Sequence, residues 1–217
     1  MSDSTILKKD LFGEIRSSQR DGQDVVVRDC RSAAPGLRWL ARRLMRREAA
    51  ALAALSDLDG IATLISVNHD RLVRSYLAGE PMQRCKPTDP AYFVAAAKLL
   101  RRMHRHGVVH NDLAKEPNML VREDGTPAII DFQLAWYSGS RGKMFRLAAR
   151  EDLRHLLKHK RSYCPQRLTE RETRLLSNPS VPSKIWARTV KPVYFFVTRR
   201  LLGWADREGA ADRGEIR

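Results

Sequence analysis

Two oxygen-bearing side chains stand at the ends of one predicted hairpin. The short apolar runs 119–122 and 128–130 are joined by a segment with an Asp-Gly pair, which is typical of tight turns between antiparallel strands. Asn118 directly precedes the first run, and Asp131 directly follows the second. Because the two strands of a hairpin run in opposite directions, we expect Asn118 and Asp131 to lie side by side at its open end.

Asp112 precedes Asn118 by six residues, on the loop that leads into the first strand, and should join the same small volume. Carboxylate and amide oxygens suit Mg²⁺, which proteins usually hold through one or two carboxylates together with the phosphates of a substrate. Taken singly, each of these residues could equally cap a turn, as Asp and Asn often do. Their joint placement beside His110 favours a magnesium–phosphate site.

This segment resembles the catalytic segment of the protein-kinase-like superfamily. In that family a His-x-Asp motif is followed by an Asn about five residues later and by Asp-Phe-Gly about a dozen residues beyond. The matching residues are His110-Asn111-Asp112, Asn118 and Asp131-Phe132-Gln133. The resemblance implies that Asp112 accepts or orients the proton of an acceptor hydroxyl, and that Asn118 and Asp131 hold Mg²⁺ on the phosphates of ATP.

The segment departs from the family pattern in two places. Asn118 follows Asp112 by six residues, and the insertion contains Lys115-Glu116-Pro117. Lys115 could contact the transferred phosphate or could be a solvated loop lysine. Gln133 stands where the family has Gly, so we do not expect an activation switch that flips.

A predicted helix at 37–55 supplies an independent feature. An apolar face is expected from its leucines, which are Leu37, Leu40, Leu44, Leu52 and Leu55. Glu48 falls near the middle of that face, where a carboxylate is costly unless a cation pairs with it. In kinases the partner is a lysine on the third strand that also holds the nucleotide phosphates, and the resemblance gives this role to Arg28.

Arg28 in the place of lysine leaves several interpretations open. Arginine can bridge a carboxylate and a phosphate, but its planar fork is not equivalent to an ammonium group. The protein could therefore be a weak kinase, an ATPase or a pseudokinase. In the alternative interpretation Arg28 is a surface residue and Glu48 a coincidence.

The other ATP contacts depend on position alone. Ser75 and Leu77 precede the break at Gly79 and occupy the place of a kinase hinge, so the resemblance predicts backbone contacts with adenine there. The glycine-rich loop that covers the phosphates in kinases is weakly represented, since only Gly13 is available and no GxGxxG occurs.

The order of predicted elements indicates an α+β protein with two unequal lobes. Strands are predicted at 11–15, 24–28, 61–67 and 71–76, and helices at 37–55 and 90–106. We predict a single kinase-like domain, with a small N-lobe (about 1–78) that has an antiparallel sheet and one helix. A reduced, mainly helical C-lobe (about 79–217) would follow, without an activation loop.

After the hairpin, the chain has no long activation loop of the kind that follows it in eukaryotic-type protein kinases. No Ala-Pro-Glu anchor occurs, and a helix begins near Arg150, in which Asp152 could cap the helix or bond back to the catalytic loop. This shortened C-lobe resembles RIO-type atypical Ser/Thr kinases and bacterial lipopolysaccharide-core (Kdo/heptose) kinases, over about residues 10–160.

The composition favours anionic partners. The 217 residues include 40 Lys and Arg against 25 Asp and Glu, a net charge of +15. Such an excess suits nucleotides, nucleic acid, anionic lipid or acidic protein. The arginines are spread over the chain without a recognition motif, so a nucleic-acid-binding module is the least favoured of these. The three cysteines lack a CxxC spacing, which argues against a disulfide framework or a zinc site.

The termini bear on location. The first ten residues do not resemble a signal peptide, and no apolar run reaches the roughly 18 residues of a membrane-spanning helix, so we expect a cytoplasmic protein. The aromatic and basic segment 185–204 could pack on its own domain or lie on the inner face of an anionic membrane.

Three functional hypotheses remain. The first is a RIO-like Ser/Thr protein kinase or ATPase that uses ATP and Mg²⁺. The second keeps this chemistry and transfers the phosphoryl group to a lipid-linked sugar of the lipopolysaccharide core. The third is a pseudokinase that binds a nucleotide or an acidic partner without catalysis.

Overall fold

The structure is a computed structural model, and it describes residues 4–177. The aromatic and basic segment 185–204, predicted to pack on its own domain or lie on a membrane, therefore lies outside the described residues. Within the described range, none of the helices combines the length and the apolar character needed to cross a membrane.

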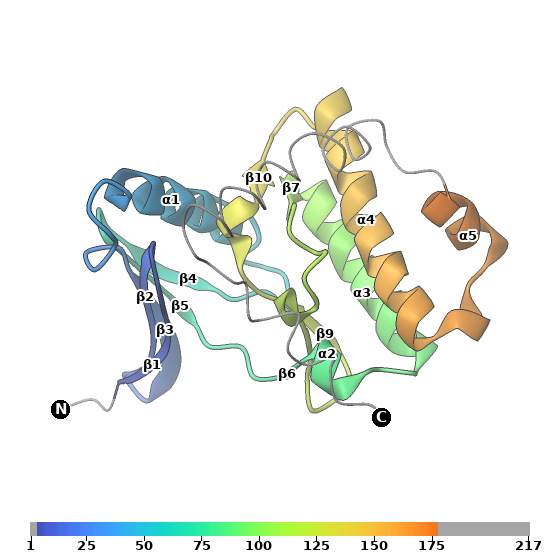
Figure 1. The fold of residues 1–217 in the computed structure, drawn as a ribbon, viewed down its shortest axis with the longest axis horizontal. Helices are drawn as coiled ribbons and strands as arrows, with labels where there is room; N and C mark the ends of the chain where they lie inside the picture. Colours follow the sequence, from blue (N-terminus) through green and yellow to red (C-terminus); the bar gives the residue numbers. More distant parts are fainter. Residues whose placement is uncertain (1–3, 178–217) are drawn as a thin grey trace, which may run out of the picture.

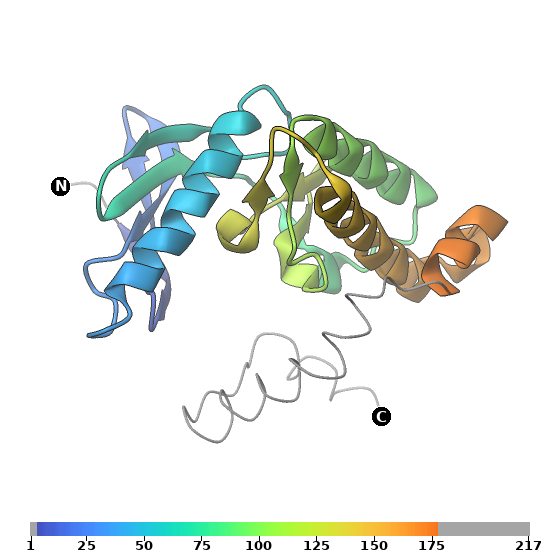
Figure 2. The same ribbon diagram turned by 90° about the horizontal axis from the view of Figure 1, so that it is seen from above.

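The N-terminal part is a five-stranded antiparallel sheet with one helix packed against it (Figures 1 and 2). The strand order is β1-β2-β3-β5-β4. The strands are β1 Thr5–Asp10, β2 Gly13–Arg20, β3 Gln23–Asp29, β4 Leu64–Val67 and β5 Arg71–Ser75, and the helix is α1 Arg38–Ala54. The turn between β2 and β3 contains Asp21 and Gly22, both with positive φ, as a two-residue hairpin requires.

Two predictions about this part were wrong in detail. The sequence did not predict β1, whose residues are mostly polar and lie at the edge of the sheet. The apolar face of α1 was predicted correctly only in part. Leu52, Leu55 and Glu48 are buried as expected, whereas Leu37, Leu40 and Leu44 are only half-buried. The buried residues of the helix are Ala41, Met45, Glu48, Ala49, Ala51 and Leu52. Small alanines on this face let the helix pack closely on its neighbours.

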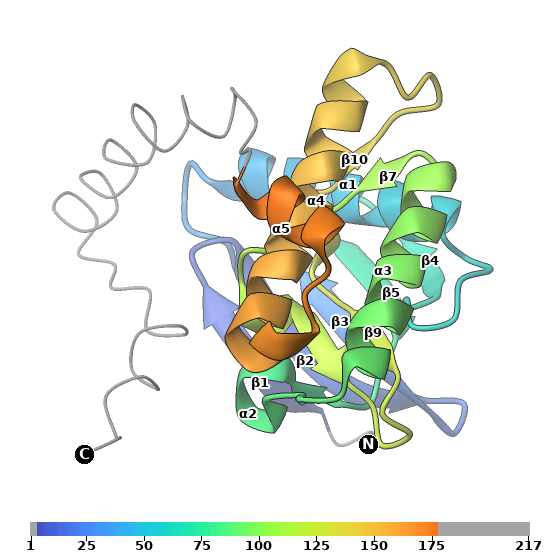
Figure 3. The same ribbon diagram turned by 90° about the vertical axis from the view of Figure 1, so that its right-hand side faces the viewer.

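The C-terminal part is mainly helical. The helices are α2 Met82–Cys85, α3 Pro90–Arg105, α4 Lys143–Tyr163 and α5 Glu170–Ser177. Helices α3 and α4 lie side by side, and α5 packs on α4 (Figure 3). Asp89 caps α3 by accepting a hydrogen bond from the Ala91 N–H, with Pro90 in the first turn, so the predicted start at residue 90 is correct.

The remaining strands of the C-terminal part are short. They form two small antiparallel sheets, β7 Val108–Val109 with β10 Trp136–Tyr137, and β6 Glu80–Pro81 with β8 Met119–Val121 and β9 Pro127–Ile129. The α+β architecture predicted from the element order is confirmed. The division of the chain near residue 79 stays a prediction.

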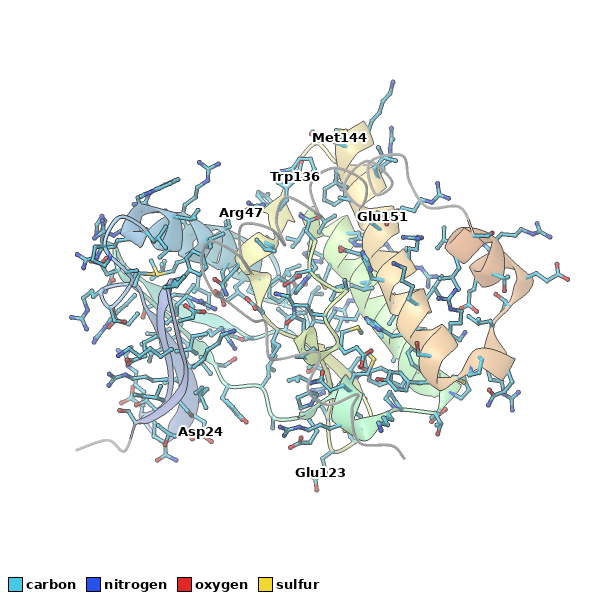
Figure 4. The ribbon with its side chains drawn as sticks, viewed as in Figure 1. Asp24, Arg47, Glu123, Trp136, Met144 and Glu151 are labelled. Atoms are coloured by element: carbon cyan, nitrogen blue, oxygen red, sulfur yellow. The ribbon has the colours of Figure 1, made fainter. Side chains whose placement is uncertain are left out.

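Arg47 makes two hydrogen bonds that join α1 to the C-terminal part. Arg47 of α1 donates from its Nε to the carbonyl of Ala135 (3.0 Å) and from its Nη2 to the carbonyl of Leu134 (3.2 Å). Both carbonyls lie at the end of the 3-10 turn Phe132–Leu134, directly after Asp131. The helix that carries Glu48 is therefore bonded to the segment that carries Asp131 (Figure 4 labels Arg47).

Candidate active site

The predicted hairpin is present. Strands β8 and β9 pair in the register Met119↔Ile129 and Val121↔Pro127, within one residue of the predicted runs. At the open end, the Ile130 N–H donates to the Asn118 carbonyl at 3.0 Å. Asn118 and Asp131 therefore flank the same end of the hairpin, as the sequence predicts.

Asn118 contacts Asp112 directly. The Asn118 Nδ2 donates to the Asp112 carbonyl (2.9 Å) and to the Asp112 Oδ2 (3.2 Å). Because the amide nitrogen is used in this way, the orientation of the Asn118 side chain is fixed, and its Oδ1 is the atom suited to a cation. The structure thus brings Asp112, Asn118 and Asp131 together, which was the central geometric prediction.

His110 joins the predicted catalytic loop, residues 110–118, to Ile130, the residue directly before Asp131. Its Nε2 lies 2.9 Å from the Ile130 carbonyl, and its Nδ1 accepts from the Asp112 N–H at 3.3 Å. These two partners assign a proton to Nε2, because the carbonyl can only accept and the amide can only donate. The buried ring packs edge-on against Phe132, with ring centroids 4.9 Å apart. His110 is therefore a structural link within the site.

Asp152 holds the catalytic loop from the other side. Its Oδ2 accepts from the His110 N–H (2.8 Å) and its Oδ1 from the Asn111 N–H (3.0 Å), while the His104 Nε2 lies 3.1 Å from Oδ2. Helix α4 begins at Lys143, so Asp152 is too far into the helix to cap it. Of the two roles left open by the sequence, the structure shows the bond to the catalytic loop.

Asp131 is held in an unusual conformation. Its φ is 65° and its ψ is 67°, a left-handed geometry that Asp tolerates better than most residues. The Gln133 Nε2 donates to its Oδ1 at 2.8 Å. Burial alone would raise the pKa of Asp131, but the positive charge of Arg28 and the bond from Gln133 outweigh it and lower the pKa. The side chain is therefore a carboxylate at neutral pH.

Gln133 is a residue whose role the sequence did not predict. Its difference from the family glycine was noted only as an argument against a flipping switch. In the structure its side chain positions Asp131. A polar side chain two residues after a predicted metal ligand is the signal that could have indicated this role.

The predicted pair of Arg28 and Glu48 is present in the sheet–helix interface. The Arg28 Nε lies 2.8 Å from the Glu48 Oε2, and only 7% of Arg28 and 1% of Glu48 are exposed. The Arg28 Nη2 lies 3.9 Å from the Asp131 Oδ1. Arg28 therefore connects the helix carboxylate to the predicted magnesium ligand.

A second arginine contacts the same carboxylate. The Arg74 Nε lies 3.4 Å from the Glu48 Oε1, so Glu48 is placed between two guanidinium groups. The sequence predicts a hinge at the neighbouring residues Ser75 and Leu77, and it does not predict a contact between Arg74 and Glu48. Leu72 and Arg74 are two residues apart on β5, so their side chains lie on the same face of the sheet. Because Leu72 is fully buried, this spacing could have placed Arg74 on the inner face.

The two arginines are affected differently by their surroundings. Burial opposes the charge of Arg28, but Glu48 and Asp131 outweigh it, and the pKa of Arg28 is raised. Burial and the nearby Arg28 lower the pKa of Arg74, although Glu48 acts in the opposite direction. The Arg28 Nε and Glu48 Oε2 are close but not aligned for a hydrogen bond. Charge, more than directed bonding, holds this cluster together.

Lys115 lies next to Asp112. Its Nζ is 3.0 Å from the Asp112 Oδ2, while its side chain remains 53% exposed. The lysine is thus close to the predicted catalytic carboxylate and also accessible to a ligand. Its contact with a transferred phosphate stays a prediction.

The predicted hinge begins at the end of β5. The Ser75 N–H donates to the Thr63 carbonyl (2.9 Å), and its hydroxyl accepts from the Thr63 N–H (2.9 Å). An adenine contact from Ser75 would therefore have to use its carbonyl. Leu77 follows the strand and packs, half-buried, against the core. Both adenine contacts stay predictions.

The donor set fits magnesium held jointly with phosphates. Among the described residues, no group of three or more His, Cys, Asp or Glu side chains could enclose a metal ion by itself. Asp131 and Asn118 offer one carboxylate and one amide oxygen, which is the sparse set that Mg²⁺ uses when phosphates and water complete its coordination. Arg28 beside Asp131 adds the positive charge that a phosphate requires.

Comparisons with known proteins give a family and a fold. A family model described as "RIO domain" matches residues 10–157, a range that includes Arg28, Glu48, the hairpin and Asp152. Among solved structures, the Rio2 kinase from Chaetomium thermophilum is similar with a TM-score of 0.61 and 18% sequence identity. The alignment covers 81% of this chain and 62% of that one, so this chain spans less than two thirds of its length. The search of curated proteins gave no match. The predicted two-lobed, protein-kinase-like fold is confirmed.

Proposed function

The chain belongs to the RIO domain family, and from that premise we propose that it is an ATP- and magnesium-dependent phosphotransferase, a RIO-like atypical Ser/Thr protein kinase or ATPase. One observation carries the proposal. Asp112, Asn118 and Asp131 converge at one end of the hairpin, and Arg28 reaches the same point from the sheet. This arrangement combines a base, two oxygen ligands and a buried cation in a single site.

Each residue of the site has a role in the proposal. Magnesium, when bound, would neutralise charge on the phosphates. Asn118 and Asp131 would hold it through their side-chain oxygens. Asp112 would accept or orient the proton of the acceptor hydroxyl, in an orientation fixed by the amide of Asn118. Lys115, which shares the Asp112 carboxylate, would come close to the transferred group.

Arg28 takes the place of the family lysine and supports nucleotide binding, which an active kinase shares with a nucleotide-binding pseudokinase. The convergence of Asp112 with Asn118 and Asp131 is what favours catalysis over silence. Arg28 lies within ion-pair distance of Glu48 and of Asp131. Such a double contact would position the guanidinium to bind the nucleotide phosphates while Glu48 keeps it in place.

The test is a transfer assay with γ-labelled ATP and Mg²⁺. Purified protein is incubated alone, with a generic protein substrate, and with core lipopolysaccharide, and both free phosphate and labelled acceptor are measured. Label on the chain itself or on protein supports the kinase, and free phosphate alone supports the ATPase. Label on the glycolipid would instead give the sugar-kinase activity, and no turnover of any kind would reject the proposal.

Asp112→Ala is the variant that separates chemistry from binding. Transfer should fall by roughly a hundred- to ten-thousand-fold, because the proton of the acceptor would lose its base. ATP affinity, measured by calorimetry with Mg²⁺, should stay near that of the wild type. Asp124→Ala removes a carboxylate from the exposed hairpin turn and serves as the matched control, for which transfer should be unchanged. Loss of ATP binding in Asp112→Ala would contradict its role as a base.

A further inference from the structure

A pocket of about 620 Å³ lies between α3, α4 and α5 and contains none of the residues assigned to the ATP site. Its volume falls within the range of roughly 300–1,000 Å³ that small-molecule sites occupy. Helix α4 and the loop before it form one wall, the C-terminal end of α3 another, and Leu175 of α5 closes a side.

The rim of the pocket is cationic. Four arginines line it, Arg105, Arg141, Arg146 and Arg150, and no carboxylate is among the lining residues. The sequence explains this asymmetry, because no Asp or Glu occurs from residue 90 to 109 or from 132 to 150. Of the next carboxylates on α4, Glu151 pairs with Arg154 and Asp152 bonds to the catalytic loop. Such a rim complements an anionic group.

The floor of the pocket is apolar. Phe145, Leu153 and Leu175 line it together with Ala149. An inorganic anion would gain nothing from these side chains, and a purely apolar ligand would gain nothing from the arginines. The lining therefore matches an amphiphile that carries a negative charge.

Exposed apolar side chains lie at the same end of the molecule. Tyr137 is 52% and Met144 61% exposed, and Trp136 lies beside Phe145 of the pocket floor, with ring centroids 6.1 Å apart. Figure 4 shows Trp136 and Met144 together near the start of α4. Aromatic residues interspersed with arginines are typical of surfaces that lie at a membrane interface.

We propose that this pocket binds one anionic glycerophospholipid and docks the chain on an anionic membrane surface. The headgroup phosphate lies among Arg105, Arg141, Arg146 and Arg150, and the first part of an acyl chain contacts Phe145 and Leu153. Trp136, Tyr137 and Met144 enter the headgroup region beside it. The proposal does not depend on phosphoryl transfer, and none of the residues it uses belongs to the segment 185–204.

His104 and Asp152 connect the pocket to the catalytic loop. His104 lines the pocket, and its Nε2 lies 3.1 Å from the Asp152 Oδ2. Asp152 in turn accepts the backbone N–H groups of His110 and Asn111. The proposed lipid would therefore lie next to the side chains that hold the catalytic loop.

The first test is calorimetry on the full chain without nucleotide, using three matched probes. These are monomeric dihexanoyl-phosphatidylglycerol, dihexanoyl-phosphatidylcholine and inorganic phosphate. Charge and chain act together only in the first, so it should bind at least about ten-fold more tightly than either of the others. Equal affinity for inorganic phosphate, or equal affinity for a short acidic peptide such as hexaglutamate, would overturn the proposal.

Variants locate the binding. The double substitution Arg141→Glu with Arg146→Glu should reduce phosphatidylglycerol affinity by at least about ten-fold, because two of the four cations would be replaced by carboxylates that repel the headgroup. Arg43→Glu with Arg46→Glu, on the exposed face of α1, makes the same change in net charge and should leave the affinity unchanged. An equal loss in both double variants would show only a general charge effect and would reject the site.

A third variant separates the pocket from its rim. Ala149→Phe fills the pocket without a change of charge, and it should also weaken phosphatidylglycerol binding by about ten-fold or more. Thermal unfolding followed by circular dichroism verifies that each variant is folded. Flotation with vesicles of equal parts phosphatidylglycerol and phosphatidylcholine then measures docking, and unaltered docking and lipid affinity in folded Ala149→Phe would overturn the proposal.

Discussion

The two halves of the candidate active site are held together by different forces. In the C-terminal half, directed hydrogen bonds fix the catalytic loop, since Asp152 accepts from the N–H groups of His110 and Asn111 and the His110 ring accepts from the Asp112 N–H. In the N-terminal half, Glu48 lies between Arg28 and Arg74, and charge balance holds the three side chains. The first half is specified by geometry and the second by electrostatics.

This difference has consequences for how each half responds to substitution. When one hydrogen bond of the catalytic loop is removed, its side chains are positioned less accurately for reaction. We expect this to lower the rate of transfer more than the free energy of unfolding. A buried charge cluster loses stability when one charge is removed, because the remaining charges stay desolvated without compensation. Asp131 belongs to both halves, since it follows the hairpin and lies 3.9 Å from Arg28.

The largest effect is expected for Asp131→Ala, which acts on both halves at once. Magnesium would lose its carboxylate, and Arg28 would lose one of two counter-charges. Magnesium-dependent turnover should fall by on the order of a thousand-fold or more. A labelled-ATP assay measures this, with circular dichroism as the check on folding. Wild-type turnover in this variant would reject the magnesium assignment.

Glu48→Gln should break the charge cluster and leave the hairpin intact. Two buried guanidinium groups would then share a neutral partner, at a cost of about 3–5 kcal/mol in the free energy of unfolding. ATP affinity should also weaken, because Arg28 would no longer be held in place. Urea unfolding and calorimetry with ATP measure the two effects.

Arg74 provides the control for Glu48→Gln. In Glu48→Gln, Arg28 keeps its contact with Asp131 but Arg74 loses its ion-pair partner, so adding Arg74→Met should restore part of the lost stability. The coupling free energy from the double-mutant cycle should therefore be favourable and of order 1 kcal/mol or more. Strict additivity of the two substitutions would show that Arg74 and Glu48 do not interact.

The two halves also differ in how well the sequence predicted them. The hairpin could be predicted to within one residue, because an Asp-Gly turn between two apolar runs is a local pattern that fixes which residues end up side by side. The pair of Arg28 and Glu48 was found only through resemblance to a family. Arg74 was missed, because its place beside Glu48 depends on the pairing of β3 with β5, in which Arg74 lies opposite Val26, 48 residues earlier in the chain.

Long-range packing explains the remaining errors in the fold. Of the leucines expected on the buried face of α1, Leu52 and Leu55 are buried, but the first half of the helix buries Ala41 and Met45 in place of Leu40 and Leu44. Helix periodicity gives several overlapping faces in a sequence rich in Ala and Leu, and only the partner surface selects one. Similarly, the sequence left two roles open for Asp152, since its bond to Asn111 spans 41 residues.

Asp152→Asn should disturb the hydrogen-bonded half selectively. Asn retains one acceptor but loses the charge that the N–H groups of His110 and Asn111 share, so the catalytic loop should lose about 1.5–3 kcal/mol of support. We expect kcat to fall roughly ten- to a hundred-fold while the KM for ATP stays nearly constant. Glu151→Gln, the neighbouring carboxylate on α4, is the matched control and should retain wild-type kcat. A comparable fall in both variants would point to a general effect on the helix.

The smallest effect is expected for Gln133→Ala, which tests the boundary between the two halves. The Gln133 Nε2 donates to the Asp131 Oδ1 at 2.8 Å, and because the Asp131 side chain is 31% exposed, water can replace the lost donor and the net cost should be about 0.5–1.5 kcal/mol. Asp131 would keep its charge and its contact with Arg28, so magnesium should still bind, but several-fold more weakly. The magnesium dependence of turnover should shift to higher concentration, with little change in the maximal rate or in the unfolding midpoint. Asp131 would then be positioned mainly by directed bonding. An unchanged magnesium dependence would show instead that the charge of Arg28 suffices, and would place Asp131 with the electrostatic half of the site.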